Sequence, residues 1–147
     1  MDATDHVYTV GMTAAEVESY LRGRQAGVLS LASDDDAYAV PVSYFYDGTS
    51  VFVRLGEGGD ESRKMAFVES TDEACFVVFD VEDEESWSVL VRGTLRAVSD
   101  PHARGFDDAA IAERFGPLRV FDEPIEEIEL VLFELDVDTI VGRRTEL

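Results

Sequence analysis

The chain has 147 residues, 46% of them hydrophobic, and its 32 acidic residues outnumber its 12 basic ones, for a formal net charge of -20. This length and apolar content suit one globular domain, 1–147, and the negative charge argues against binding nucleic acid or an anionic membrane. The acids are spread along the chain, which indicates a hydrated, halophilic surface suited to concentrated salt.

The first half of the chain is predicted to contain a helix followed by three strands. Residues 1–12 are expected to form a flexible N-terminal arm. Thr13 and Glu16 form a capping box, which predicts a helix that ends near Arg24. Asp47-Gly48 is a strong hairpin signal. The predicted strands are Ala26–Ala32, Ala37–Tyr46 and Ser50–Leu55.

Pro41 interrupts the second of these strands. Proline has no N–H group to donate to a β-ladder, so it is confined to edges and bulges of a sheet. We therefore expect Pro41 to mark an edge, a bulge or a place where another group approaches the strand.

The second half is predicted to add three strands and two helices. The expected segments, in chain order, are a glycine-rich flexible loop Gly56–Glu61, a short helix capped by Ser62, a strand Glu73–Asp80, an acidic loop Val81–Glu85, a strand Trp87–Val98, a helix from Asp100-Pro101 to about Phe115, and a strand Ile128–Leu135. About six strands joined by hairpins, without βαβ alternation, predict a mainly β protein: an antiparallel barrel with peripheral helices.

Lys64 is the only lysine of the chain, and it follows Ser62 and Arg63 at the start of a predicted helix. A helix N-terminus carries partial positive charge and free N–H groups, so cations there are unfavourable unless an anion is bound. A phosphate would accept bonds from the N–H groups, the hydroxyl and both cations. The alternative is that the two cations form exposed ion pairs with nearby acids.

The motifs around this triplet resemble those of the pyridoxamine 5'-phosphate oxidase-related flavoproteins. In order along the chain they are Val40–Tyr44, Asp47-Gly48, Val51–Val53, the triplet, Trp87–Gly93 and the tail Ile140–Arg144. The resemblance implies an FMN-binding split β-barrel with Greek-key-like strand order. It also implies a homodimer with one FMN in each of two clefts between the subunits.

The same resemblance implies which residues bind the cofactor. By position, Ser62, Arg63 and Lys64 would bind the FMN phosphate. Beside the isoalloxazine ring it places Pro41, Val42 and Ser43, together with Val53 and Arg54. From the other subunit it places Trp87 and Ser88. Each of these flavin contacts has a structural alternative. Val42 and Val53 would then be ordinary core residues, Trp87 would close the end of the barrel, and Ser88 would be an ordinary strand residue.

Other kinds of site have little support in the sequence. His6 and His102 lack the neighbours that a zinc site needs, so no metal site is expected. Cys75 lies in an apolar run, which indicates a buried small hydrophobe rather than a nucleophile. No stretch approaches the roughly 20 apolar residues of a membrane span, and the acidic N-terminus does not resemble a signal peptide, so we expect a cytoplasmic protein.

An FMN-dependent oxidoreductase acting on a small organic molecule is the first functional hypothesis, with the cofactor carrying the chemistry. A flavin carrier or sensor without turnover is the second, and the same barrel binding a deazaflavin coenzyme or haem is the third. Pyridoxamine 5'-phosphate oxidases have basic residues for the substrate phosphate. Here only Arg143 and Arg144 are candidates, and the match is weak, so pyridoxamine phosphate is not the expected substrate.

Overall fold

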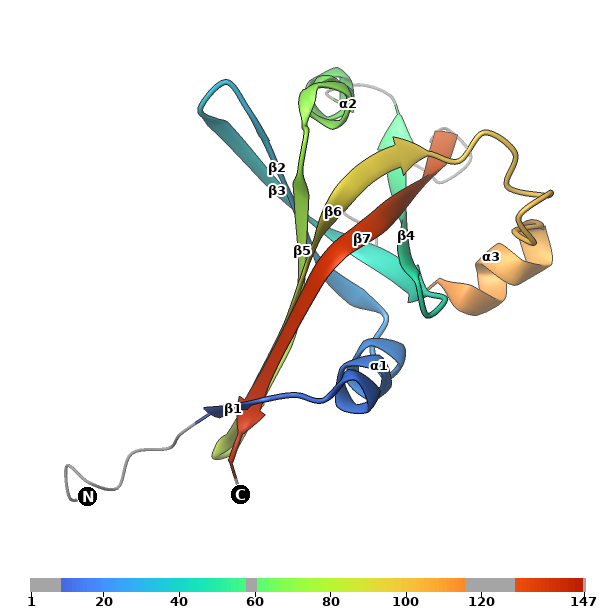
Figure 1. Cartoon of the computed structure of the whole chain (residues 1–147). Helices are drawn as coiled ribbons and strands as arrows, with labels where there is room; N and C mark the ends of the chain where they lie inside the picture. The colour runs from blue at the N-terminus through green and yellow to red at the C-terminus, as the bar shows by residue number, and fades with distance from the viewer. Residues whose placement is uncertain (1–8, 58–60, 116–128, 147) are drawn as a thin grey trace.

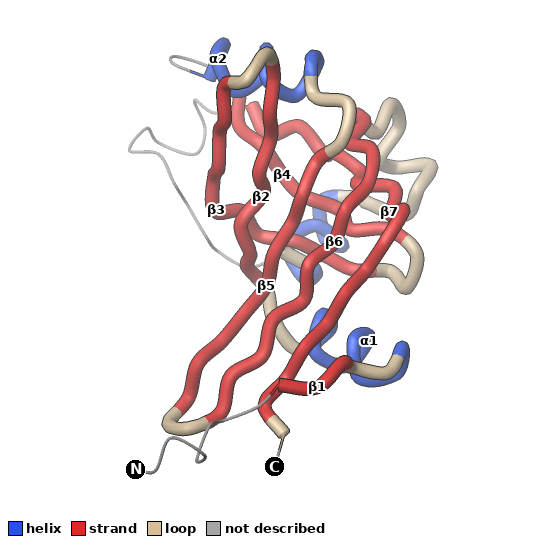
Figure 2. Tube along the Cα trace, turned by 60° about the vertical axis from the view of Figure 1, so that its left-hand side comes forward, coloured by secondary structure: helices blue, strands red, loops and turns tan. Residues whose placement is uncertain are grey.

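Six strands close into an antiparallel barrel in the computed structural model, which describes residues 9–57, 61–115 and 129–146 (Figures 1 and 2). Around the barrel the strands follow the order β7-β4-β3-β2-β5-β6, and β6 pairs back with β7. β5 lies beside β2 after the β2-β3-β4 meander, which is a Greek key. The predicted fold class is confirmed. The strands are β2 (Ala26–Ser33), β3 (Asp36–Tyr46), β4 (Ser50–Glu57), β5 (Ala74–Glu82), β6 (Glu85–Ala97) and β7 (Glu129–Thr145).

Short turns join the neighbouring strands. Between β2 and β3, Asp34 and Asp35 have φ values of 49° and 67°, as a type I′ turn requires. At the predicted β3–β4 hairpin, the Asp47 side chain accepts hydrogen bonds from the backbone N–H groups of Thr49 and Ser50, which fixes the turn. The predicted loop Val81–Glu85 is wrong, because β5 and β6 stay in register as far as Glu82 and Glu85 and leave a two-residue turn.

Helix α1 (Ala14–Arg22) covers one end of the barrel. The predicted capping box is present: the Glu16 N–H donates to Thr13 Oγ1 at 3.2 Å, and Thr13 N–H donates to Glu16 Oε1 at 3.0 Å. The hydroxyl of Tyr44 donates to the Leu21 carbonyl at 2.5 Å and ties the helix to β3. Strand β1 (Thr9–Gly11) precedes the helix and pairs with the end of β7, so part of the predicted arm is a strand.

Helix α2 (Glu61–Ser70) covers the opposite end of the barrel (Figure 1). It buries Phe67 and Val68, and the Phe67 ring stacks on Tyr38 with 5.5 Å between centroids. Residues 58–60 of the predicted loop Gly56–Glu61 lie outside the described residues, and the other three are not a loop. The first two residues of that segment extend β4 along β7, and its last residue begins the helix.

The helix predicted from Asp100 to about Phe115 is wrong in its first half. The chain turns instead, because Gly105 adopts a left-handed φ of 83° that interrupts helical geometry. Asp107 then caps a shorter helix, α3 (Asp108–Arg114).

The last strand is much longer than the predicted Ile128–Leu135. β7 continues to Thr145 because β6 offers it a partner along its whole length, so the predicted tail is part of the sheet. Gly142 permits this packing, since a Cβ there would lie 2.5 Å from the sulfur of Met12.

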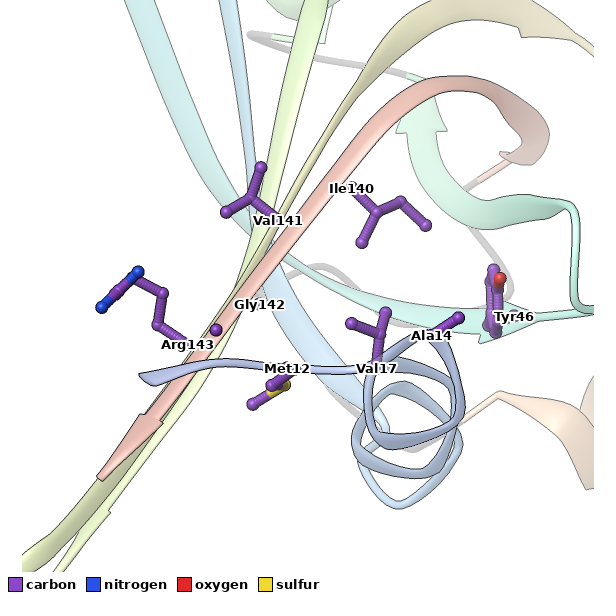
Figure 3. Close-up of a pocket in the computed structure, with 9 residues that line it drawn as sticks. Met12, Ala14, Val17, Tyr46, Ile140, Val141, Gly142 and Arg143 are labelled. Atoms are coloured by element: carbon purple, nitrogen blue, oxygen red, sulfur yellow. The ribbon is translucent and has the colours of Figure 1, made fainter. Parts of the chain in front are cut away.

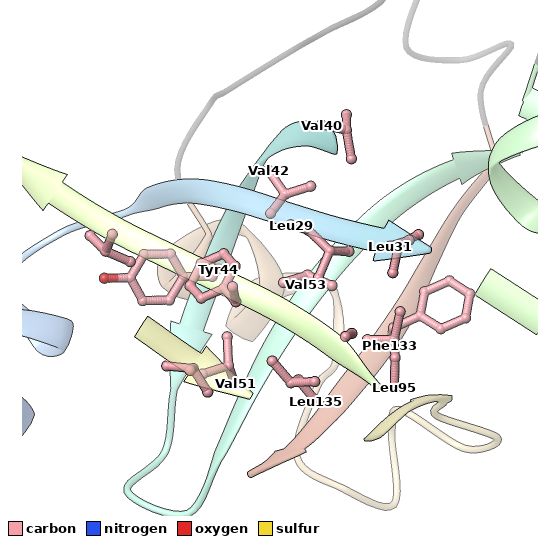
Figure 4. Close-up of a cluster of buried hydrophobic side chains, with 14 of the residues drawn as sticks. Leu29, Leu31, Val40, Val42, Tyr44, Val51, Val53, Leu95, Phe133 and Leu135 are labelled. Carbon is pink, nitrogen blue, oxygen red and sulfur yellow. The ribbon is translucent and has the colours of Figure 1, made fainter. Parts of the chain in front are cut away.

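Apolar side chains from every barrel strand fill the interior (Figure 4). A second, smaller cluster lies on the outside of β4 and β7, where the segment around α3 covers them; its buried members are Phe52, Phe106, Phe115 and Leu132. Among the described helices, none combines the length and apolar character needed to cross a bilayer.

Candidate cofactor-binding site

Ser62, Arg63 and Lys64 lie in the first turn of α2, directly after β4 and a short connection. The helix begins at Glu61, so Ser62 is already helical and is not the predicted N-cap. An acidic residue at the helix start is favoured by the dipole, which explains the earlier beginning. The side chains of 61–65 lie outside the described residues. The backbone nevertheless places the triplet where helix N–H groups have no partner within the helix.

Within the described residues, the edge of β3 opposite β2 is open over a stretch that begins next to this end of the barrel. β3 pairs with β2 from Asp36 to Ser43, but it pairs with β4 only from Tyr44 to Tyr46. Along the first stretch, no strand of the described residues covers the other edge. The two strands diverge at Ser43, and this divergence splits the barrel wall.

Pro41 lies on that open edge, and the hydrogen-bond pattern shows why proline is tolerated. The Tyr44 N–H donates to the Gln25 carbonyl, toward β2. Because successive N–H groups of a strand point to opposite sides, the nitrogen of Pro41 faces away from β2, where no ladder bond is lost. Of the three readings of Pro41, the structure supports an edge position. Its ring is exposed.

Val42 and Val53 point into the barrel and belong to its core, with exposures of 4% and 0% (Figure 4). Their backbones, not their side chains, border the split between β3 and β4. Ser43 and Arg54 lie on the outward side, at the point where the strands separate. Ser43 is buried, and the guanidinium of Arg54 lies 5.0 Å from the centre of the Phe115 ring. Burial lowers the pKa of Arg54 from its ordinary value.

Trp87 and Ser88 lie at the other end of the molecule. They begin β6 next to the β5–β6 turn, whereas α2 lies at the opposite end of these strands (Figures 1 and 2). Trp87 packs against Tyr20 of α1, with 4.5 Å between ring centroids, and Arg24 lies over its ring at 5.5 Å. Ser88 is exposed on the outside of the sheet. This edge of β3 begins beside α2, where Tyr38 stacks on Phe67, and runs past Pro41 to Ser43, which pairs with Ala26 at the end of β2 that follows α1. Trp87 and Ser88 of the same chain lie near the β5–β6 turn, away from α2.

A row of apolar side chains crosses the outside of five strands, and reasoning from the sequence missed it. The register pairs Pro41 with Val28, Val28 with Val77, Val77 with Leu90, and Leu90 with Val141. Directly paired residues share one face of a sheet, so all five side chains point outward together.

Two neighbouring residues of β5 extend this row. Phe79 and Val81 are 59% and 66% exposed, and Val141 is 56% exposed. We call Pro41, Val28, Val77, Leu90, Val141, Phe79 and Val81 the outer apolar face. A signal for it exists in the sequence, because β5 is apolar on both faces, as strands covered on both sides are. Cys75, predicted to be buried, is half-buried on this outward side of β5.

A cavity of about 420 Å³ adjoins the outer apolar face between β1, α1 and β7 (Figure 3). Its walls are mostly apolar, with Met12, Val17, Ile140 and Val141, and Arg143 stands at its edge. Arg143 donates through Nε and Nη2 to Thr9 at 2.9 and 2.7 Å, which orients the guanidinium. None of the ten predicted cofactor residues lines this cavity. Within the described residues, no group of three His, Cys, Asp or Glu side chains is placed to hold a metal ion.

The family model for pyridoxamine 5'-phosphate oxidase matches residues 13–144, which is most of the chain. No curated protein matches the sequence significantly.

Several solved structures share the fold. An FAD-binding protein from Mesorhizobium loti superimposes with a TM-score of 0.73 at 17% identity, covering 97% of this chain and 100% of its own. An FAD-binding protein from Mycobacterium smegmatis gives a TM-score of 0.63 at 22% identity, with 94% and 99% covered. A flavocytochrome from Azotobacter vinelandii gives 0.66 at 14% identity, with 99% and 75% covered. At these identities the likeness establishes the fold alone.

Proposed function

The chain belongs to the pyridoxamine 5'-phosphate oxidase family, and we propose that it is a flavoprotein that binds FMN between two copies of itself and acts as an oxidoreductase on a small molecule. The observation that carries this proposal is the position of the triplet: the only lysine of a chain with net charge -20 follows an arginine in the first turn of α2. Two FAD-binding proteins and a flavocytochrome among the relatives in fold support a flavin as the ligand.

The first turn of α2 suits a phosphate. Arg63 and Lys64 stand at the positive end of a helix, where their charges oppose the dipole unless an anion lies between them. Backbone N–H groups of the turn and the Ser62 hydroxyl add donors to the two cations. A phosphate held in this way resolves the electrostatic conflict, which exposed ion pairs would resolve only weakly.

The open edge of β3 suits the flat ring system of a flavin. Pro41 offers an exposed apolar ring there, and Ser43 and Arg54 lie where β3 and β4 separate. Val42 and Val53 contribute backbone, since their side chains fill the core. Bound FMN would supply a ring that accepts a hydride or single electrons. The chain would bind and orient that ring and exclude water from it.

A second copy of the chain would complete the site. Ser88 is exposed on the sheet that carries the outer apolar face, far from the triplet of its own chain. Packing two outer apolar faces together would cover three side chains that are more than half exposed and would bring Ser88 of one copy toward the triplet end of the other. Trp87 already packs within its own chain against Tyr20. We therefore expect Ser88, rather than Trp87, to make the direct contact.

The phosphate assignment is tested by comparing FMN with riboflavin, which lacks the phosphate. Replacing Arg63 and Lys64 together with Gln should weaken FMN binding roughly 100-fold or more, since hydrogen bonds to charged groups contribute about 1.5–3 kcal/mol each, and should change riboflavin binding little. Arg96→Gln is the control, because Arg96 is an exposed arginine of β6 that pairs with Asp136 of β7 and is not among the assigned flavin residues. Equal losses for both ligands would place the phosphate elsewhere, and absence of any flavin binding would refute the proposal.

Turnover is tested separately on the flavin-loaded protein. Anaerobic addition of NADH or NADPH should bleach the flavin absorption, and a small-molecule acceptor should restore it over many cycles. A flavin that is bound tightly but is neither reduced nor reoxidised on this timescale would indicate a carrier or sensor instead.

A further inference from the structure

A second pocket lies between the end of α1, the β3–β4 hairpin and the segment around α3. Its volume is about 250 Å³. Three arginines and three phenylalanines contribute to its lining: Arg22, Arg104, Arg114, Phe45, Phe52 and Phe106. None of the ten residues assigned to the flavin is among them.

The arginines gather positive charge in an otherwise acidic protein. Three of the chain's 12 basic residues face this one pocket. Arg22 pairs with Glu18 at 3.0 Å, and Arg104 pairs with Glu134 at 3.1 Å, so their charges are balanced. Asp47, which also lines the pocket, accepts three hydrogen bonds on Oδ1 within its own turn.

Arg114 differs from the other two arginines. Within the part of the chain that the structure describes, no carboxylate pairs with it. It donates one bond, from Nη1 to the Gly105 carbonyl at 3.1 Å. Its guanidinium lies 5.1 Å from the ring centres of Phe45 and Phe106, which hold it in place. The remaining donors of this oriented cation are available to an anion.

The phenylalanines of the pocket indicate which kind of anion would bind there. Phe52 and Phe106 have 4.8 Å between their ring centroids, and Phe45 meets Phe106 edge-on at 6.1 Å. Flat apolar walls next to a planar cation fit a flat ring that carries a carboxylate, since a guanidinium binds carboxylates through paired bonds. The volume lies just below that of pockets for drug-sized ligands, so it suits a one-ring molecule rather than a nucleotide.

We propose that this pocket binds a small aromatic carboxylate, with the carboxylate on Arg114 and the ring against Phe45, the least buried of the three phenylalanines. The pocket shares no lining residue with the proposed flavin site. We therefore expect occupancy neither to require the flavin nor to displace it.

Benzoate is the probe, titrated by calorimetry into the full-length, FMN-loaded protein and into the protein without flavin. We expect saturable binding of one benzoate per chain in both, with an unchanged flavin spectrum. Benzamide, which has the ring without the charge, should bind at least 10-fold more weakly. Arg114→Gln should weaken benzoate at least 10-fold, whereas Arg96→Gln should not change it.

A second variant outside α3 tests the pocket independently, in case Arg114→Gln unfolds that helix. Phe45→Leu keeps an apolar wall but removes a ring, so it should weaken benzoate several-fold and leave cyclohexanecarboxylate unaffected; thermal melts verify that both variants are folded. The proposal is overturned by wild-type affinity in folded Arg114→Gln, by equal affinity for benzoate and benzamide, by displacement of the flavin, or by a lack of saturable binding at millimolar benzoate.

Discussion

The two faces of the sheet formed by β5, β6 and β7 carry similar apolar residues in different surroundings. On the inner face, Phe76, Val89 and Val91 have no exposure, because the other strands close over them. On the outer face, Phe79 and Val141 are more than half exposed. Monomeric proteins rarely leave such residues together on their surface. The inner face is completed by the chain itself, whereas the outer one is the face proposed above to pack against a second copy.

The largest expected effect comes from truncating a ring on each face of β5. Phe76→Ala removes a side chain that packs edge-on against Tyr44, with 5.0 Å between centroids, and should cost about 3–5 kcal/mol of unfolding free energy. Phe79→Ala should change it by less than about 0.5 kcal/mol in samples dilute enough to be monomeric. Urea unfolding of both variants measures the difference. Similar losses at the two positions would show that the outer side is covered within one chain.

The second prediction addresses the partner of the outer apolar face. Val141→Asp would place an unpaired charge in the proposed interface and should weaken self-association roughly 100-fold or more, which sedimentation velocity measures. Flavin affinity should fall with it. Ser19→Asp, a charge added on the exposed side of α1, is the matched control and should change neither property. A Val141→Asp variant that stays dimeric would exclude this face from the interface.

The smallest effect concerns an outer surface that the chain does cover, where the segment before α3 lies on β4 and β7. Glu134 accepts bonds there from Arg104 at 3.1 Å and from Ser50 at 2.8 Å. Glu134→Gln should cost about 1 kcal/mol at neutral pH, since the arginine is partly exposed.

The pH dependence of this cost has a defined sign. The hydrogen bond from Arg104 lowers the pKa of Glu134 from its ordinary value of 4.5. A lowered carboxyl pKa contributes stability above the unfolded-state value, and that contribution is lost as the pH falls through the folded-state value. The difference between wild type and Glu134→Gln should therefore be constant above about pH 5 and shrink below about pH 4. Denaturant midpoints over this range measure it, and a difference that grows on acidification would contradict the role of the pair.

Features encoded within a few neighbouring residues were predictable from the sequence. The Thr13–Glu16 capping box and the Asp47-Gly48 turn each depend on groups two or three positions apart, and both are present. The length of β7 was not predictable, because charged residues interrupt its apolar pattern. Its extent depends on pairing with residues of β6 that lie 36 to 57 positions earlier in the chain. Gly105 shows a further limit: its left-handed geometry belongs to a turn that replaces the first half of a helix that composition favours.

The candidate site also combines features that neighbouring residues predict with features that depend on distant strand pairing. The start of α2 at the triplet was predicted from a local pattern, and the helix begins at Glu61, within two residues of the predicted start. The open edge at Pro41 was one of three readings that proline chemistry allowed. The separation of Ser88 from the triplet and the alignment of Pro41 with Val141 depend on the strand order and the register of five strands, which no single segment encodes.

The closing role of β7 has a consequence for synthesis. β7 pairs with β1, β4 and β6, and it is the last of the barrel strands to be made. Until it emerges from the ribosome, β4 and β6 present unpaired edges that invite aggregation, and the long-range pairing that removes them is slow to form. The excess of negative charge would keep such unfinished chains apart, so the same acidity that hydrates the native surface also protects the protein while its barrel is still open.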